Sequence, residues 1–149
     1  MTDTAPNPAP KHAIVTGASR GIGRAVALRL ARDGFAVVVN YAGAADKAAE
    51  VVEQITSRGG RAVAVQADVA DAAGVARLFD RAEQAHGKIG VVVNSAGIMK
   101  LFPIASGQVE DFDAVFNVNV RGTFNVLSRR RSASPMAAAS SPCPPASSE

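Results

Sequence analysis

A glycine-rich stretch between an apolar run and a helical pattern constrains this chain most. It reads Thr-Gly-Ala-Ser-Arg-Gly-Ile-Gly over residues 16–23. Gly17 allows a sharp turn at the end of a strand, Gly21 leaves the backbone open to a pyrophosphate, and Gly23 lets the following helix lie close to the sheet. Strand, glycine turn and helix together indicate a dinucleotide site with the phosphates at the helix N-terminus. The alternative interpretation is a structural tight turn.

Apolar runs and helical patterns alternate along the rest of the chain. The runs have few polar interruptions, which is typical of parallel strands buried on both faces. We therefore expect an α/β fold, a partial Rossmann-type doubly wound parallel sheet with strand order 3-2-1-4. Ligands bind where that order reverses, at the carboxyl ends of the first and fourth strands. The strands are expected at 11–16, 35–40, 61–66 and 89–94, and the helices at 21–33, 44–58, 71–86 and 109–127.

The two ends of the chain differ in composition from the middle. Residues 1–10 are mostly Pro, Ala, Thr and Asn and predict a disordered leader. Residues 128–149 are rich in Ser, Arg, Ala and Pro, without the periodicity of a strand or a packed helix. Reading this tail in a shifted frame permits a fifth strand that ends in serines. We therefore expect a frameshifted or truncated tail after a domain at 11–127.

Composition excludes several classes of function. Of 149 residues, 48% are hydrophobic and 19% charged, which indicates one globular domain. The net charge is only +3, and the basic run Arg129–Arg131 has no interleaved aromatic residues, so nucleic-acid binding is not expected. Cys143 is the single cysteine, which excludes an internal disulfide, and no cluster of metal ligands occurs. No stretch is apolar enough for a signal peptide or a membrane span, so we expect a cytoplasmic protein.

Four motifs occur in the order in which one enzyme family carries them. After the glycine stretch come Asp68-Val69, then Asn94-Ser95-Ala96-Gly97, then Asn-Val-Asn-Val-Arg-Gly at 117–122. Over residues 11–127 the chain resembles the short-chain dehydrogenase/reductase family, near its 3-oxoacyl-[acyl-carrier-protein] reductases. The resemblance implies hydride transfer between a nicotinamide cofactor and a small carbonyl or alcohol substrate, in enzymes that are homo-oligomers when intact.

The residues around the turn favour NADP(H) over NAD(H). Arg20 lies within the turn, where a guanidinium can pair with a 2′-phosphate. NAD sites carry an acid at the end of the second strand, and here we assign that place to the neutral Asn40. In the family, a basic residue in this turn implies the same choice, and the acid at Asp68 contacts the adenine amino group beside the Val69 backbone. The alternatives are a surface arginine and a capping aspartate.

The loop after the fourth predicted strand departs from the family at one position. The family usually has Asn where Ser95 stands, and serine keeps a donor and an acceptor on a shorter side chain. Ala96 and Gly97 are small, as is needed where a cofactor ribose lies against backbone. The expected cofactor-binding residues are Gly17, Ser19, Arg20, Gly21, Ile22, Gly23, Asn40, Asp68, Val69, Asn94, Ala96 and Gly97.

Asn119 is the one candidate catalytic residue. It shares a helical face with apolar residues from Phe112 to Val126, where an unpaired amide would cost about 1–3 kcal/mol. In the family, this asparagine holds a helix irregularity and a water in a proton relay. The alternative is a structural asparagine.

The Ser, Tyr and Lys of the family's chemistry have no counterparts here. The single tyrosine is Tyr41, and Ala45 stands four residues after it. Three functions stay open: an NADP-dependent oxidoreductase represented by its N-terminal part, an inactive NADP-binding module, and an interaction fragment that pairs with a full-length reductase through the helix at 112–127.

Overall fold

Apolar strands pair side by side in the computed structural model, which describes residues 11–133. The four strands are β1 (His12–Thr16), β2 (Ala36–Tyr41), β3 (Arg61–Gln66) and β4 (Val91–Asn94). All pairs are parallel, and the sheet order is β3-β2-β1-β4. The predicted fold class and strand order are therefore confirmed. The carboxyl ends of β1 and β4 are adjacent, since Thr16 pairs with Asn94.

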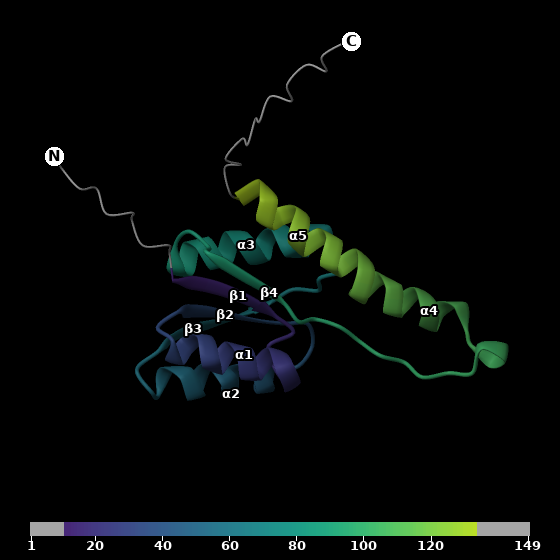
Figure 1. Ribbon diagram of the computed structural model, residues 1–149, viewed down its shortest axis with the longest axis horizontal. Coiled ribbons are helices and arrows are strands. Elements are labelled where there is room, and N and C mark those ends of the chain that lie inside the picture. The colour runs from purple at the N-terminus through teal and green to yellow at the C-terminus, as the bar shows by residue number, and fades with distance from the viewer. Residues whose placement is uncertain (1–10, 134–149) are drawn as a thin grey trace, which may run out of the picture.

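Helices cover both faces of this sheet. In Figure 1, α1 and α2 lie against one face, whereas α3 and α5 lie against the other. Asp71 caps α3 as predicted, because its carboxylate accepts a hydrogen bond from the N–H of Ala73 at 3.0 Å. The α-helices are α1 (Gly21–Arg32), α2 (Ala45–Thr56), α3 (Ala72–His86), α4 (Val109–Phe116) and α5 (Gly122–Ala133).

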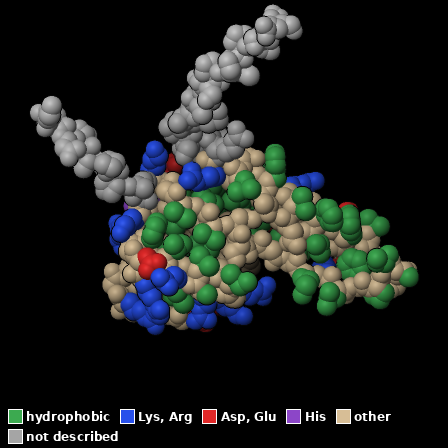
Figure 2. Space-filling view, viewed as in Figure 1, with side chains coloured by type: hydrophobic (Ala, Val, Ile, Leu, Met, Phe, Trp, Pro, Cys, Tyr) green, Lys and Arg blue, Asp and Glu red, His purple; other side chains and the backbone are tan. Residues whose placement is uncertain are grey.

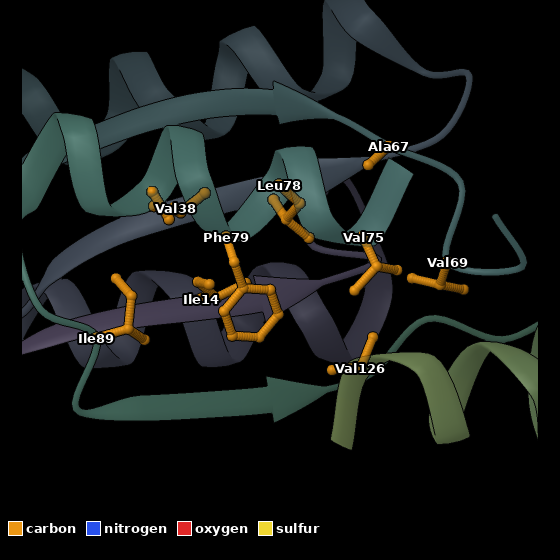
Figure 3. Packing of buried hydrophobic residues seen from close by; sticks show 10 residues of the cluster. Ile14, Val38, Ala67, Val69, Val75, Leu78, Phe79, Ile89 and Val126 are labelled. Atoms are coloured by element: carbon orange, nitrogen blue, oxygen red, sulfur yellow. The ribbon is translucent and has the colours of Figure 1, made fainter. Parts of the chain in front are cut away.

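The core has two parts because successive strand residues point to opposite faces. Ile14 and Val38 contribute to the cluster under α3 and α5, which includes Phe79 (Figure 3). Val15 and Val39 contribute to the cluster under α1 and α2. All four strand side chains are fully buried, which explains why β1 and β2 are apolar on both faces.

The predicted helix at 109–127 is divided into three parts. Between α4 and α5 lies one π-helical segment, η2 (Asn117–Arg121). α4 extends away from the sheet (Figure 1), so its predicted buried face is wrong in part: Phe112 and Phe116 are 50% and 48% exposed. Their rings stack on each other with centroids 4.3 Å apart. Val126 of α5 is fully buried, because α5 packs over the sheet.

The predicted end of the last helix at residue 127 is also wrong. α5 continues to Ala133 and is held by tertiary contacts. Arg129 forms an ion pair with Asp80 of α3 at 2.9 Å, and Arg130 donates to the carbonyl of Gly90 at 2.8 Å. The predicted leader at 1–10 and the part of the predicted tail at 134–149 lie outside the described residues. Within the described part of the chain, no helix is both long and apolar enough to cross a membrane.

Candidate dinucleotide site

A cleft of about 680 Å³ lies at the carboxyl ends of β1 and β4. This volume is within the range of roughly 300–1,000 Å³ that is common for small-molecule sites. A smaller hollow of about 360 Å³ lies among the ends of α1 and α2 and contains none of the predicted site residues. The predicted residues that line the cleft are Gly17, Ser19, Arg20, Gly21, Ile22, Gly23, Asn40, Asp68, Val69, Ala96 and Gly97.

The glycine turn has the backbone that its sequence predicts. Gly17 and Gly21 have φ of +61° and +55°, which side chains rarely tolerate. A Cβ on Gly17 would lie 2.7 Å from Cα of Ala96, so the turn packs directly against the loop after β4. A Cβ on Gly21 would meet no atom within 4 Å, which leaves open space over the turn. The close packing of Gly23 is against the carbonyl of Gly17, at 2.4 Å from a Cβ, rather than against a strand.

The start of α1 offers hydrogen-bond donors to this open space. Its N-cap is Arg20, whose side chain makes no capping hydrogen bond, and no acid lies in the first turn. The first N–H groups of a helix have no partners within the helix, and the helix dipole makes this end positive. The turn therefore provides a place for an anion such as a phosphate.

Asn40 has a structural task that the sequence did not reveal. Its side chain is 1% exposed, and its Nδ2 donates to the carbonyls of Val65 at 3.2 Å and Ala67 at 3.1 Å. Its Oδ1 accepts from the N–H of Gly17 at 3.4 Å. Because these bonds hold the amide inside, the part of β2 that faces the cleft continues with Tyr41 and the loop at 42–44. Asn40 therefore fixes the glycine turn to the ends of β2 and β3.

Arg20 is exposed at the rim of the same cleft. Its guanidinium makes no ion pair or hydrogen bond with any residue that the structure describes. Across the cleft, the stretch from Asn40 to Ala44 contains no carboxylate. The rim at this end of the cleft therefore carries a positive charge with no acid opposite it.

The loop after β3 forms another wall of the cleft. Asp68 is exposed, and one of its carboxylate oxygens accepts from the N–H of Ala70 at 2.9 Å. Its other carboxylate oxygen has no hydrogen bond, and neither does the N–H of Val69, within the described part. The loop thus presents an acceptor beside a donor.

Thr16 organises the loop after β4, although sequence reasoning did not single it out. Its buried hydroxyl donates to Oδ1 of Asn94 at 2.9 Å and accepts from the N–H groups of Ser95 and Ala96, both at 3.1 Å. Asn94 also donates to the hydroxyl of Thr123 at 2.9 Å. Asn94 is therefore held behind the cleft rather than in its lining. The signal was available, since Thr16 is the polar residue at the end of an apolar strand.

Asn119 lies in the π-helical segment and is bound to the same loop. Its Nδ2 donates to the carbonyl of Ile98 at 2.8 Å, and its Oδ1 accepts from the N–H of Ile98 at 2.9 Å. The carbonyl of Asn119 accepts from the hydroxyl of Thr123 at 2.6 Å. A Cβ on Gly97 would lie 3.3 Å from Oδ1 of Asn119, so the loop and the segment are in close contact. The structure places Asn119 at the cleft floor, with one amide hydrogen still unused.

Comparisons with known proteins agree with this geometry. The family model described as short chain dehydrogenase matches residues 11–137. The chain is 43% identical over 119 residues to 3-oxoacyl-[acyl-carrier-protein] reductase FabG of Staphylococcus epidermidis, covering 80% of this chain and 49% of the relative. The chain thus spans about half the length of the curated relatives that it matches.

Two solved structures with bound cofactor are also similar. One is a short-chain dehydrogenase from Burkholderia cenocepacia in complex with NADP, with 40% identity and a TM-score of 0.79 over 85% of this chain and 52% of that one. The other is a blue fluorescent protein from a metagenomic library in complex with NADPH. It has 36% identity and a TM-score of 0.77 over 83% of this chain and 51% of that one.

Proposed function

The chain belongs to the short-chain dehydrogenase family, and on that premise we propose that it holds NADP(H) in the cleft at the ends of β1 and β4. The whole protein would be an oxidoreductase that acts on a small carbonyl or alcohol. Bound there, the cofactor supplies hydride at its nicotinamide ring. The FabG relative and the two structures with NADP and NADPH support this proposal.

The observation that carries the choice of NADP(H) is the unpaired guanidinium of Arg20. A planar guanidinium binds a phosphate in two places, and an exposed one at the rim can do so without losing another partner. A carboxylate at the end of β2 would repel a 2′-phosphate, but the stretch from Asn40 to Ala44 has none. The exposed Arg20 therefore favours the phosphorylated cofactor.

The remaining cleft residues fit the other parts of the cofactor. The start of α1 and the open space over Gly21 suit the pyrophosphate. The free carboxylate oxygen of Asp68 and the free N–H of Val69 match the amino group and the neighbouring ring nitrogen of adenine. We assign the small residues Ala96 and Gly97 to the ribose nearer the nicotinamide.

Asn119 is the chain's candidate for proton transfer. Its unused amide hydrogen lies at the floor of the cleft and could hold a water there. The tyrosine and lysine that would protonate the substrate oxygen have no counterparts in this sequence, because Tyr41 is followed four residues later by Ala45. We therefore propose that these 149 residues bind cofactor but do not turn over substrate alone, and that the tail from about residue 128 is read out of frame. Gene sequencing across this junction tests the frameshift, which fails if no shifted frame encodes a strand and a Tyr-Lys helix.

A second candidate function is an interaction fragment that pairs with a full-length reductase. It rests on the exposed apolar side chains along the last helix: Val120, Phe124 and Leu127 are 56%, 68% and 52% exposed. Figure 2 shows hydrophobic side chains gathered on the part of the molecule that projects from the sheet. NADPH fluorescence titration of the purified chain separates the two, since only the cofactor site predicts saturable binding. Co-purification with a full-length reductase, without NADPH binding, would favour the interaction fragment.

A further inference from the structure

The loop after β3 is held by a helix far along the chain. Asn125 of α5 donates its Nδ2 to the carbonyl of Val69 at 2.9 Å and to that of Ala70 at 3.3 Å. These residues are 56 and 55 positions away in sequence. A single amide group therefore ties two consecutive carbonyls of a cleft wall to α5.

Side-chain packing strengthens the same contact. Val69 is 4% exposed, and a Cβ on Gly122 would lie 2.6 Å from its Cγ2, so α5 has a glycine where the loop presses against it. Val126 lies one position after Asn125, is fully buried and belongs to the same core cluster as Val69. In Figure 3, Val126 projects from α5 toward Val75, with Val69 beyond the start of α3. The helix thus fixes the loop by both hydrogen bonding and shape.

The local bonds of the loop set its shape but not its place. The N–H of Ala70 bonds to the carboxylate of Asp68, and the N–H of Asp71 bonds to the carbonyl of Asp68 at 3.1 Å. Both bonds lie inside one turn, so they would move with it. The bonds from Asn125 connect this turn to another part of the fold, and they decide where Asp68 and the free N–H of Val69 stand in the cleft.

We propose that Asn125 is a positioning residue for the adenine end of the bound cofactor. This inference rests on the proposed function. α5 also holds the opposite wall, through Thr123 to Asn94, and the adjoining η2 holds it through Asn119 to Ile98. One continuous helical stretch therefore sets the positions of both walls, and Asn125 is its contact with the adenine side.

The test compares Asn125→Ala with Asn117→Ala, because the side chain of Asn117 makes no hydrogen bond within the described part. The probes are NADPH and 2′,5′-ADP, which carries only the adenine half. Both are titrated well below the melting temperature of each variant. A neutral hydrogen bond contributes about 1 kcal/mol, and 1.4 kcal/mol is tenfold in affinity. We expect Asn125→Ala to weaken both probes by the same factor, roughly fivefold or more, and Asn117→Ala to change neither.

Amide hydrogen exchange provides a readout that does not need ligand. Asn125→Ala should speed exchange of the Ala70 and Asp71 amides, because the turn can then move as a unit. If the alanine variant does not fold, Asn125→Ser replaces it, with a shorter donor and a smaller expected effect. Equal affinities of wild type and variant for both probes would overturn the inference alone. Wild type that binds neither probe would overturn the proposed function, and the inference with it.

Discussion

The hydroxyl of Thr16 and the side-chain oxygen of Asn94 are joined by a 2.9 Å hydrogen bond across 78 positions of sequence. This bond joins the ends of the two strands where the sheet order reverses. The same hydroxyl accepts from the N–H groups of Ser95 and Ala96. One buried threonine therefore determines how the chain leaves β4 and enters the floor of the cleft.

Thr16→Val should destabilise the fold strongly for a substitution of equal size. It leaves two backbone N–H groups and Oδ1 of Asn94 without a partner, and each buried unsatisfied group costs about 1–3 kcal/mol. We expect a loss of at least about 2 kcal/mol in the free energy of unfolding, measured by urea denaturation. Thr56→Val is the matched control, because Thr56 is exposed on α2 and bonds only to carbonyls of its own helix. Its effect should stay within about 0.5 kcal/mol, and equal losses for both variants would contradict the role of Thr16.

Gly17→Ala and Gly21→Ala should separate folding from cofactor binding. Both positions have positive φ, so each alanine costs about 1–2 kcal/mol in the backbone. At Gly17 the new Cβ would also press on Ala96, whereas at Gly21 it would meet only open space. Gly17→Ala should therefore lower the melting temperature more, and Gly21→Ala should mainly weaken NADPH binding. Unchanged NADPH affinity in Gly21→Ala would contradict the assignment of that space to the pyrophosphate.

His86 should make stability depend on pH. Burial lowers its pKa from 6.5, and the neighbouring His12, whose ring centroid is 6.1 Å away, lowers it further. Its Nε2 is buried without a hydrogen-bond partner. The unfolded chain therefore takes up a proton at higher pH than the folded one, and stability falls as the pH drops below about 6.5.

The measurement is the melting temperature between pH 5 and pH 8, with His86→Gln as the comparison. The wild type should lose stability toward pH 5, and the variant should lose less. The same slope in both proteins would mean that another group is responsible.

Local patterns predicted the parts of the fold that depend on local residues. The strand at 61–66 has the predicted bounds, and the order of the sheet follows from apolar runs that alternate with helices. The division of the last helix was not predicted from the pattern of residues, because η2 is accompanied by the pairing of Asn119 with the backbone of Ile98, 21 positions away. The extension of α5 was missed because its polar sequence is held by Asp80 and by the carbonyl of Gly90.

The candidate site shows the same division between local and distant contacts. Glycine spacing predicted the turn, since positive φ and close approach are local requirements. The sequence placed Asn40 at the rim by its position after β2, but a buried amide can bond inward, and here it bonds to Gly17, Val65 and Ala67. The clamp from Asn125 to the loop after β3 joins residues that only the folded chain brings together.

The most direct test of the central claim is the affinity of the purified chain for NADPH against NADH, in wild type and Arg20→Ala. A charge-assisted pair with a phosphate contributes about 1.5–3 kcal/mol, which is roughly 10- to 150-fold in affinity. We predict saturable NADPH binding, weaker NADH binding, and loss of most of that difference in Arg20→Ala, with NADH affinity nearly unchanged. Equal affinity of the wild type for both cofactors, or no binding of either, would contradict the account.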